Sequence, residues 1–395
     1  MNWFNQVISV TLFNLRSIPQ RLAASLVAVI GVSAVVGVFA AVLSMARGFE
    51  RTMLAAGSDD AVVILRAGAT GELASAVTNE QIQIVATAPG IRVEDGSPMV
   101  SGELYVVVDV DKKSTQEAAN VPLRGVQQGA YGIRQNLSII EGRPFEPGRN
   151  ELLVGRSAQR MFEGLQVGDV IPFGQNEWSV VGVFEDDGSV SESELWADVR
   201  VVQSAYRRGN SYQTIRAKLV TPEAIDELKA ALDADPRIDV DVFSEREFYS
   251  QQSKTMTSLI SAIGYPVTFL MAIGAVFGAL NTMYSSISAR GKEIATLRAI
   301  GFGPTPVLVS VIVESTVLSV LGGIIGGALA WLFFNGFTVS TLNAASFSQV
   351  VFDFAVTGDL ISRGLVAAVV IGLVGGLFPA VRSVRAPVAA ALREQ

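Results

Sequence analysis

The residue types that carry most protein chemistry are scarce in this sequence. Its 395 residues include no Cys and no His. Ser-His-Asp and Cys-His catalytic groups, the common zinc sites, disulfides and thiol redox centres are therefore excluded. Any catalysis would have to use carboxylates, but Glu314 is the only ionisable residue inside a long apolar stretch, and it has no second carboxylate beside it. We expect no catalytic residue, cofactor site or metal site on this chain.

Four long apolar stretches predict how the chain is organised. Half of all residues are hydrophobic, only 17% are charged and the mean hydropathy is +0.41, whereas about 25% of residues are charged in soluble domains. A helix of about 20 apolar residues crosses a bilayer. The predicted transmembrane helices are residues 22–46, 255–289, 306–337 and 364–381. A secretory signal peptide is the alternative for the first stretch, but its apolar run exceeds the roughly 7–15 residues of such peptides.

The charges that flank these stretches predict their orientation. Residues 1–21, 290–305 and 382–395 together contain eight basic and two acidic residues, and Lys and Arg concentrate on the cytoplasmic side of short loops. Both termini are therefore expected in the cytoplasm. Residues 47–254 carry 21 basic and 32 acidic residues, so this region faces outward and is no nucleic-acid surface. Residues 338–363 are expected as a short loop on the same outer side.

The predicted fold class is an integral membrane protein with four transmembrane helices and a large mixed α/β extracytoplasmic domain inserted between the first two. Val-, Ile- and aromatic-rich runs bounded by turn residues predict strands in this domain. These runs are Ala61–Leu65, Leu104–Val110, Glu151–Val154 and Trp178–Phe184.

Helix starts are marked by capping residues. Thr78 and Gln81 form a capping box, and Thr221 before Pro222 predicts a helix that ends near Asp235. Ser244 and Glu247 predict the start of a helix that continues through the second apolar stretch. It would be ~65 Å long, about twice the hydrocarbon thickness, so a stalk is expected to project from the membrane.

Glycines at four-residue spacing recur in the later apolar stretches. Such pairs let helix backbones approach closely, although Gly is also common in membrane helices for other reasons. We expect these helices to pack on one another or on a second copy of the chain. The pairs are Gly274 with Gly278, Gly322 with Gly326, Gly323 with Gly327, and Gly372 with Gly376.

Glu314 and the segment 290–305 are the candidate functional residues. A lone carboxylate within the membrane is a functional hypothesis by default. Glu314 lies near the cytoplasmic end of its stretch and can pair with a basic residue there, so a structural or coupling role is favoured over substrate or proton binding. Segment 290–305 is typical of a short helix, with Ile294, Leu297 and Ile300 at helical spacing and Gly301 suited to the left-handed position after its end.

A helix this short needs a partner. On the residues alone, docking to a protein and resting on lipid headgroups are equally good explanations of the segment. Residues 1–21 have apolar side chains on roughly one side, including Trp3, Phe4 and Ile8. They are predicted to form an amphipathic helix along the inner leaflet, in contact with membrane lipid.

At this point the sequence resembles the permease subunits of MacB-type and FtsX-like ABC transporters. The most specific part is Arg290–Gly303, which is similar to the cytoplasmic coupling helix of that family, followed by Glu314 and Gly322-Gly323. Segments of residues 14–36 and of the outer domain also resemble the family, the latter its periplasmic core domain. The outer segments are Glu141–Phe145, Leu153–Arg156, Val167–Val170 and Val180–Val183. One departure is that Pro387 leads to Leu392-Arg393 without the acidic residue that the family often has.

The resemblance implies a permease in the bacterial cytoplasmic (inner) membrane that works as a homodimer or heterodimer with two ABC ATPase subunits, which bind ATP and Mg. ATP hydrolysis would move the outer domain, for export or for mechanotransmission. The sequence has no Gly-Xaa4-Gly-Lys-Ser/Thr phosphate loop, which is consistent with an ATPase on another chain. The expected ATPase contacts are Arg290, Lys292, Glu293, Ile294, Leu297, Arg298 and Gly301.

Other functions stay open at this stage. The main alternative is an FtsX-like regulator that activates a periplasmic hydrolase or other partner without transporting a substrate. A periplasmic adaptor or a lipoprotein is a further possible partner, and no nucleic acid is expected. An intramembrane enzyme is disfavoured because Glu314 stands alone, and a secondary transporter because there is one buried acid and no visible inverted repeat.

Overall fold

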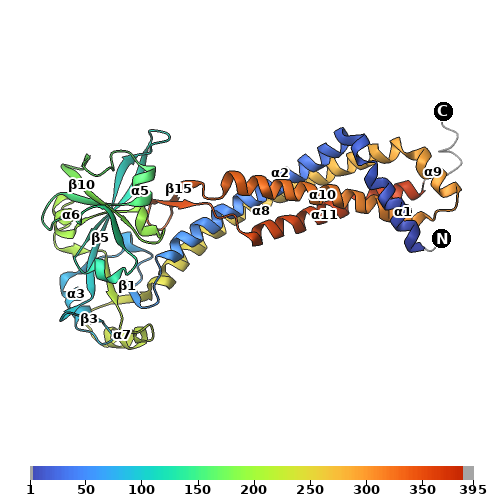
Figure 1. The fold of residues 1–395 in the computed structure, drawn as a ribbon. Helices are drawn as coiled ribbons and strands as arrows, with labels where there is room; N and C mark the ends of the chain where they lie inside the picture. The colour runs from blue at the N-terminus through green and yellow to red at the C-terminus, as the bar shows by residue number, and fades with distance from the viewer. Residues whose placement is uncertain (1–2, 386–395) are drawn as a thin grey trace. The chain divides into compact units, whose positions relative to one another are not determined.

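The structure is a computed structural model that describes residues 3–385 and divides into two compact units. The helical unit contains the residues up to Arg47, Leu259–Phe337 and the residues from Phe354 on. The sheet unit contains Gly48–Ser258 and Thr338–Asp353. Figure 1 shows helices in the first and a mixed α/β fold in the second. Each unit is therefore built from segments that are distant in the sequence.

The elements are as follows. The helices are α1 Trp3–Arg16, η1 Ile18–Arg21, α2 Leu22–Ala55, η2 Glu72–Ala74, α3 Asn79–Ala86, α4 Ala130–Ile133, α5 Arg156–Met161, η3 Val190–Ser193, α6 Val199–Ala205, α7 Ala224–Asp233, α8 Glu245–Ala289, α9 Gly291–Ala299, α10 Pro304–Phe334 and α11 Gly358–Arg385. The strands are β1 Ala61–Arg66, β2 Val77–Thr78, β3 Val93–Glu94, β4 Ser97–Pro98, β5 Val100–Asp111, β6 Ala118–Val126, β7 Ser138–Gly142, β8 Glu151–Gly155, β9 Val170–Phe173, β10 Asn176–Glu185, β11 Leu195–Asp198, β12 Ser211–Tyr212, β13 Thr214–Lys218, β14 Val240–Ser244, β15 Thr338–Asn343 and β16 Ser348–Asp353.

Four helices among the described residues, α2, α8, α10 and α11, are long and apolar enough to cross a membrane. Each contains or closely overlaps one of the four predicted stretches. The helix α8 is one continuous element of 45 residues, as the capping pattern at Ser244 predicts, and the backbone N–H of Glu247 donates to the Ser244 hydroxyl (3.1 Å). The position of these helices in a bilayer stays a prediction.

The predicted loop 338–363 is wrong. Its first part is a β-hairpin, β15 and β16, which belongs to the sheet unit, and the last helix begins at Gly358 rather than at 364. The helix was predicted too short because Asp359 and Arg363 interrupt the apolar run. In the structure these two side chains form an i, i+4 ion pair (3.0 Å) on the helix surface, which a helix end tolerates.

The sheet unit is organised around a mixed ten-stranded sheet with the order β14-β1-β13-β5-β6-β11-β8-β10-β7, and β9 pairs with β10. Most pairs are antiparallel, but β10 with β8 and β11 with β6 are parallel. The core contains fully buried Trp178, Phe162 and Leu123 together with many Val and Ile side chains. The four predicted strands correspond to β1, β5, β8 and β10.

Of the three predicted helix starts in the sheet unit, those at Thr78 and Ser244 are correct and that at Thr221 is wrong. Thr78 and Gln81 form the complete capping box of α3. The helix predicted from Thr221 begins only at Ala224 and ends at Asp233. Thr221 and Pro222 instead form a turn in which the carbonyl of Thr221 accepts from the backbone N–H of Ala224 (3.2 Å). A proline after Thr is compatible with either a turn or a first helical turn.

The β15–β16 hairpin is held to the sheet unit by polar contacts. The hydroxyls of Tyr105 and Ser348 are 2.6 Å apart, and the backbone N–H of Val351 donates to the Ser193 hydroxyl (2.9 Å). Phe352 packs edge to face on Phe49, with 5.5 Å between ring centroids. Because the hairpin is the connection between α10 and α11, the sheet unit is attached to the chain of the helical unit through this connection as well as through α2 and α8.

Candidate functional site

The predicted coupling segment 290–305 forms the helix α9, Gly291–Ala299, within the helical unit. Gly301 has a φ of +105°, the left-handed conformation predicted for it. Lys292 and Glu293 are exposed, and so is Ile300, whose side chain is 69% exposed. Ile300 is thus a large apolar side chain exposed beside charged ones at the end of a short helix.

The other predicted contact residues of α9 lie deeper. Ile294 and Leu297 are half-buried, and the guanidinium of Arg298 donates to the carbonyl of Val384 in α11 (2.9 Å). The prediction for Arg290 needs correction. Its side chain is buried rather than facing outward, because it binds Asn14 and Glu293 and lies close to Glu314.

Glu314 lies at the centre of a polar cluster, as its predicted pairing with a basic residue requires. Its carboxylate is 3.3 Å from Nη2 of Arg21 and 3.6 Å from Nη1 of Arg290. The Arg290 guanidinium also donates to the side-chain carbonyl of Asn14 (2.8 Å), and the Asn14 amide donates to Ser310 (2.7 Å). This cluster, termed the helical cluster, joins α1, the 3-10 turn before α2, the start of α9 and α10. Its members are Asn14, Arg21, Arg290, Glu293, Ser310 and Glu314.

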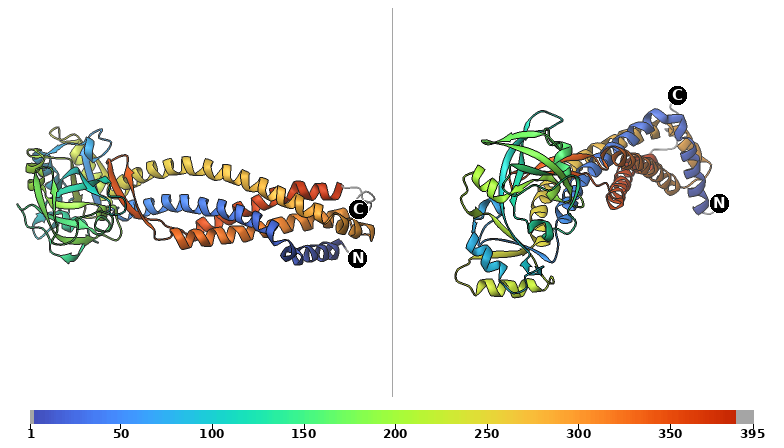
Figure 2. Two further views of the ribbon diagram at one scale, coloured as in Figure 1. Left: turned by 90° about the horizontal axis from the view of Figure 1, so that it is seen from above. Right: turned by 60° about the vertical axis from the view of Figure 1, so that its left-hand side comes forward.

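The predicted glycine pairs pack inside the helical unit at three of the four sites. A Cβ at Gly326 would lie 2.3 Å from the carbonyl oxygen of Ser33 in α2, and Gly322 meets the same helix. Gly323 and Gly327 face α11, and Gly372 and Gly376 face α10. Figure 2 shows α10 and α11 running side by side. A Cβ at any of these glycines except Gly327 would lie less than 3.0 Å from an atom of the neighbouring helix, so a larger residue would force the helices to shift.

The fourth pair, Gly274 and Gly278, is different. No atom lies within 4 Å of a Cβ built at either position. The helix α8 that carries them is also the least covered of the four apolar helices, with 11% of its most apolar window buried against 44% for each of the others. Among the residues that the structure describes, no neighbouring helix therefore packs against this pair.

The helix α1 has an exposed apolar surface. Val10 and Asn14 are buried, whereas Trp3, Phe4, Ile8 and Leu12 are about half exposed or more. The side-chain carbonyl of Gln6 accepts from the backbone N–H of Gly303 (3.2 Å), so α1 is also tied to the segment between α9 and α10. An amphipathic helix with exposed Trp and Phe is typical of a membrane interface.

Sequence reasoning missed a buried charge network in the sheet unit, termed the sheet cluster. Arg124 on β6 binds both oxygens of Glu72 and both oxygens of Glu194, with distances of 2.7–3.0 Å. Arg134 binds both oxygens of Glu103 (2.8 and 3.0 Å). All members are nine-tenths or more buried. They are Glu72, Glu103, Arg124, Arg134, Glu194, Arg216 and Glu245.

The electrostatics of the sheet cluster favour the ionised form of Glu103 and Glu72, whereas burial raises the pKa of Glu245 despite its pairing with Arg216. Burial by itself raises the pKa of Glu103, but the guanidinium groups of Arg134, Arg216 and Arg124 outweigh this and lower the pKa to about 2. The pKa of Glu72 is also lowered, because the charges of Arg124 and Arg216 outweigh the effect of its burial. For Arg124, burial lowers the pKa, but Glu194 and Glu72 raise it well above its usual value. Bidentate guanidinium–carboxylate pairs account for this mutual stabilisation.

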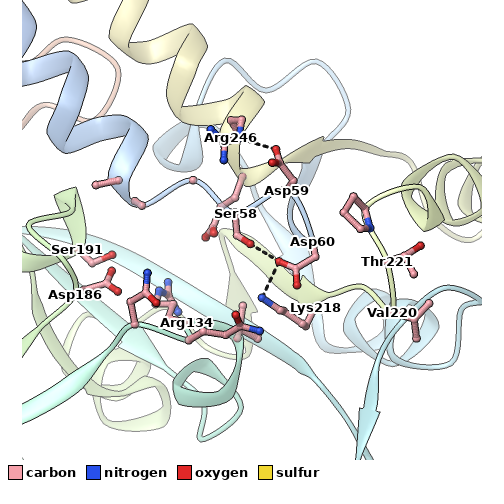
Figure 3. A pocket seen from close by; sticks show the side chains of 18 residues that line it. Ser58, Asp59, Asp60, Arg134, Asp186, Ser191, Lys218, Val220, Thr221 and Arg246 are labelled. Atoms are coloured by element: carbon pink, nitrogen blue, oxygen red, sulfur yellow. Dashed lines mark hydrogen bonds and ion pairs between the residues drawn. The ribbon is translucent and has the colours of Figure 1, made fainter.

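A polar cavity of about 440 Å³ lies beside the sheet cluster, within the sheet unit. Figure 3 shows the side chains around it. Lys218 of β13 is 2.8 Å from Asp60, and Arg246 in the first turn of α8 is 2.6 Å from Asp59. The cavity is lined by the segment that leaves α2 and by the start of α8. It therefore marks the place where both long helices join the sheet.

Family models match most of the chain. The MacB-like periplasmic core domain matches residues 23–235, and the FtsX-like permease C-terminal domain matches residues 266–388. The first model alone covers more than half of the sequence. The predicted tail 382–395, like the unusual Pro387 segment, lies mostly in residues 386–395, outside the described residues.

Individual proteins agree with the family models. The chain is 25% identical to an uncharacterized ABC transporter permease of Methanocaldococcus jannaschii, over 95% of each chain. It is also 25% identical to the macrolide export ATP-binding/permease protein MacB of Bdellovibrio bacteriovorus, over 89% of this chain and 56% of that protein. The chain thus spans nearly all of the first relative and about half the length of the second.

A solved structure is similar in part. The periplasmic region of MacB from Actinobacillus actinomycetemcomitans aligns with a TM-score of 0.37 and 14% identity, covering 52% of this chain and 94% of that one. This chain is a multi-pass membrane protein with an extracytoplasmic α/β domain, and it belongs to the MacB/FtsX-type permeases of ABC transport systems.

Proposed function

We propose that this chain couples ATP hydrolysis by separate ABC ATPase subunits, which bind ATP and Mg, to motion of its sheet unit on the outer side of the membrane. The coupled motion would serve export or mechanotransmission. The relative in Bdellovibrio bacteriovorus is named as an ATP-binding/permease protein, which supports an ATP-driven partner. Both termini and α9 would lie in the cytoplasm, as the excess of basic residues in those segments indicates.

The observation that carries the proposal is the position of α9. It is short, it stands between the apolar helices α8 and α10, and it presents Lys292, Glu293 and Ile300 at its surface. Its N-cap residue Arg290 is anchored in the helical cluster beside Glu314. Arg290 is the single residue between α8 and α9, and it also contacts Glu314 of α10. A displacement of α9 would therefore reach both α8 and α10 through Arg290. The same Arg290 side chain also binds Asn14 of α1 and Glu293 of α9, so the start of α9 is held next to α10 and α1.

The test is a substitution on the exposed end of α9. With Ile300→Asp, the complex purified with its ATPase should lose ATPase subunits and about tenfold or more of its hydrolysis rate, as expected when an apolar contact residue is replaced by a charge at an interface. Ile300→Val is the matched control, because it keeps the apolar contact, and should behave as wild type. Unchanged hydrolysis and subunit recovery in Ile300→Asp would contradict the proposal.

The orientation has its own test, for which the absence of Cys is an advantage. In intact cells, Lys292→Cys should be inaccessible to a membrane-impermeant maleimide and should react after the cells are opened. Ser114→Cys in the turn between β5 and β6 should react in both cases. Labelling of Lys292→Cys from outside would invert the proposed topology.

We further propose that the open face of α8 contacts a second permease, a copy of this chain or a related one. Gly274 and Gly278 support this, because pairs of the same spacing elsewhere in the helical unit all pack against a neighbouring helix. In a bilayer, Gly278→Cys should form a disulfide-linked dimer on oxidation, whereas Val366→Cys, on the exposed surface of α11, should not. Equal cross-linking at both positions would indicate random collision.

A further inference from the structure

The first turn of α8 enters the sheet unit through a buried carboxylate. Glu245 directly follows β14 and is 4% exposed, while its neighbours Arg246 and Glu247 are exposed. The Glu245 carboxylate pairs with Nη1 of Arg216. One charged side chain of this helix is therefore directed into the core of the sheet unit rather than into solvent.

Arg216 connects this carboxylate to the centre of the sheet. Its side chain is fully buried on β13, and its Nε lies 3.2 Å from the Glu103 carboxylate of β5. Its Nη2 donates to the Tyr249 hydroxyl (2.9 Å), one helical turn after Glu245. A single guanidinium thus joins two adjacent strands to the first two turns of α8. Moving α8 away from the sheet would leave buried charges without partners, which is strongly unfavourable.

The segment that leaves α2 is fastened at the same place. A Cβ at Gly57 would lie 2.8 Å from the Cα of Arg246, and the backbone N–H of Arg246 approaches the carbonyl of Ser58 (3.4 Å). Asp60, two residues further on, is bound by Lys218 (2.8 Å). Figure 3 shows the Lys218–Asp60 contact next to Ser58 and Arg246. Lys218 is two residues after Arg216 on β13, so both cations project from the same face of one strand.

Not all of these contacts can transmit motion equally. The Arg246–Asp59 pair is exposed, with both side chains more than half accessible, and exposed ion pairs separate at little cost. The contacts of Arg216 are buried and include three polar partners, Glu103, Glu245 and Tyr249. Among the side-chain ion pairs at this end of α8, those of Arg216 therefore resist separation most.

We propose that Arg216, bound to Glu245 and Tyr249 of α8 and to Glu103 of β5, is the positioning residue through which displacement of α8 is passed to the sheet. This inference rests on the proposed function, because it assumes that α8 is displaced during the ATP cycle. It assigns to α8 a fixed attachment rather than a hinge within its first two turns. The sheet and the first turns of α8 then move as one body.

The attachment can be tested by a distance between spin labels inside the sheet unit. Ser114→Cys on the β5–β6 turn and Thr255→Cys on α8 are exposed positions, and they would be the only thiols of the labelled chain. In the complete complex in nanodiscs, with and without a non-hydrolysable ATP analogue, the wild-type attachment should give one narrow distance distribution that is the same in both states.

Glu245→Gln removes the charge that holds Arg216 and should broaden the distribution about twofold or more, because a half-satisfied buried network rearranges. Glu247→Gln is the matched control on the exposed side of the same turn and should keep the wild-type width. Tyr249→Phe, which removes one hydroxyl, should give an intermediate width, and it remains informative if Glu245→Gln fails to assemble. A residue with only a structural role would change the thermal stability but not this distance.

Unchanged distributions in both Glu245→Gln and Tyr249→Phe would overturn the inference, and so would a wild-type distance that changes between nucleotide states. The outcome is separate from that of the proposed function. If Ile300→Asp has no effect on the ATPase while Glu245→Gln broadens the distance distribution, the coupling proposed for α9 is contradicted and the attachment through Arg216 is supported. If Ile300→Asp abolishes hydrolysis and the distance does not respond to Glu245→Gln, only the attachment fails.

Discussion

The sheet cluster and the helical cluster both bury charges, but they bury them in different ways. In the sheet cluster, Arg124 binds two carboxylates with both oxygens of each, at distances of 2.7–3.0 Å. In the helical cluster, Glu314 lies 3.3 Å from Arg21 and 3.6 Å from Arg290, and neither contact is bidentate. Arg21 is also 18% exposed, and Glu293 is 55% exposed. The sheet cluster is therefore paired by short bidentate contacts and shielded from solvent, whereas the helical cluster has longer single contacts and is partly exposed to solvent.

This difference matches what each region is proposed to do. Bidentate pairs in a dry interior fix both distance and angle, so the sheet cluster favours one arrangement of the segments that carry Glu72, Glu103, Arg124, Arg134 and Glu194. Longer, partly hydrated contacts can exchange partners at low cost. The helical cluster joins α1, α9 and α10, the elements that would move relative to one another when an ATPase acts on α9. A permease that transmits motion needs a rigid part and a part that can rearrange.

The largest effect is expected from Arg124→Met. It leaves the carboxylates of Glu72 and Glu194 buried without a counter-charge, which should lower the free energy of unfolding of the sheet unit by about 3–5 kcal/mol. Unfolding can be followed by the emission of the buried Trp178 and Trp196. The background replaces Trp3 and Trp331, the only other Trp residues, by Phe.

The matched control is Arg149→Met. Arg149 forms an exposed ion pair with Glu146 (3.0 Å), so its loss should change the free energy of unfolding by less than about 1 kcal/mol. If Arg124→Met were as stable as Arg149→Met, the sheet cluster would be no more rigid than a surface ion pair, and the contrast between the two clusters would disappear.

The second-largest effect is expected from acid, which should destabilise the sheet unit. Because the pKa of Glu103 is lowered to about 2 in the folded state, its stabilisation is fully present above the ordinary carboxylate pKa near 4.5. It is lost as the pH falls toward 2. The pKa of Glu72 is also lowered in the folded state, so protonation of Glu72 destabilises the sheet unit in the same way. At about 1.4 kcal/mol per pH unit, the loss for Glu103 is about 3 kcal/mol.

The measurement is Trp emission against pH in the same Trp3 and Trp331 background. The folding stability should fall steeply below about pH 4.5, as Glu103 and Glu72 become protonated. Glu245, whose pKa is raised by burial, contributes a slope of the opposite sign above that pH. Stability that rises on acidification below that pH would show that Glu103 and Glu72 are protonated in the folded state.

Much of the fold could be predicted from local patterns. Strands such as β8 and helix α3 follow from alternation and a capping box, and the glycine spacing predicted backbone packing that the structure shows at three of four sites. The helix α9 could also be predicted from the sequence, since Gly301 and Pro304 mark its end. These features depend on residues close in the sequence, where the physical cause and its effect lie within a few turns.

The sheet cluster could not be predicted in the same way. Glu103, Arg124 and Arg216 become neighbours only because β5 lies between β6 and β13 in the sheet, and that order is set by long-range packing. A partial signal existed, because Arg216 and Lys218 sit at alternate positions of a Thr-Ile-Arg-Ala-Lys-Leu run. Charges on one face of a buried strand require partners. Conversely, the hairpin of β15 and β16 was missed although Val350, Val351 and Phe352 are typical of a strand.

A smaller effect is expected from changing glycine contacts in the helical unit. Gly326→Ala places a Cβ 2.3 Å from the Ser33 carbonyl, which should cost about 1–3 kcal/mol through overpacking. Gly274→Ala, which meets no atom within 4 Å, should be neutral for the folded chain in nanodiscs, as measured by loss of helical circular dichroism on heating. Similar loss in both would mean that intrahelical effects of Ala, and not interhelical contact, set the stability.

The smallest effect on stability is expected at Glu314, and it separates the two clusters most sharply. Glu314→Gln keeps a hydrogen-bond acceptor, Arg290 keeps Asn14 and Glu293 as partners, and Arg21 is 18% exposed. The change in unfolding free energy should therefore be about 1 kcal/mol, below the roughly 3–5 kcal/mol for a buried charge left unpaired. Its effect on coupling should be larger than on stability, because Arg290 then loses the contact that joins the start of α9 to α10.

The expected result is normal assembly with the ATPase and a several-fold loss of whatever output the complex produces per ATP hydrolysed. A double-mutant cycle with Arg21→Gln should give a coupling energy below about 1 kcal/mol, whereas a cycle between Arg216→Gln and Glu245→Gln should exceed it. Equal coupling energies in the two cycles would mean that the loose geometry around Glu314 does not reflect a weaker interaction. The division of the chain into a fixed and a rearranging region would then have no energetic basis.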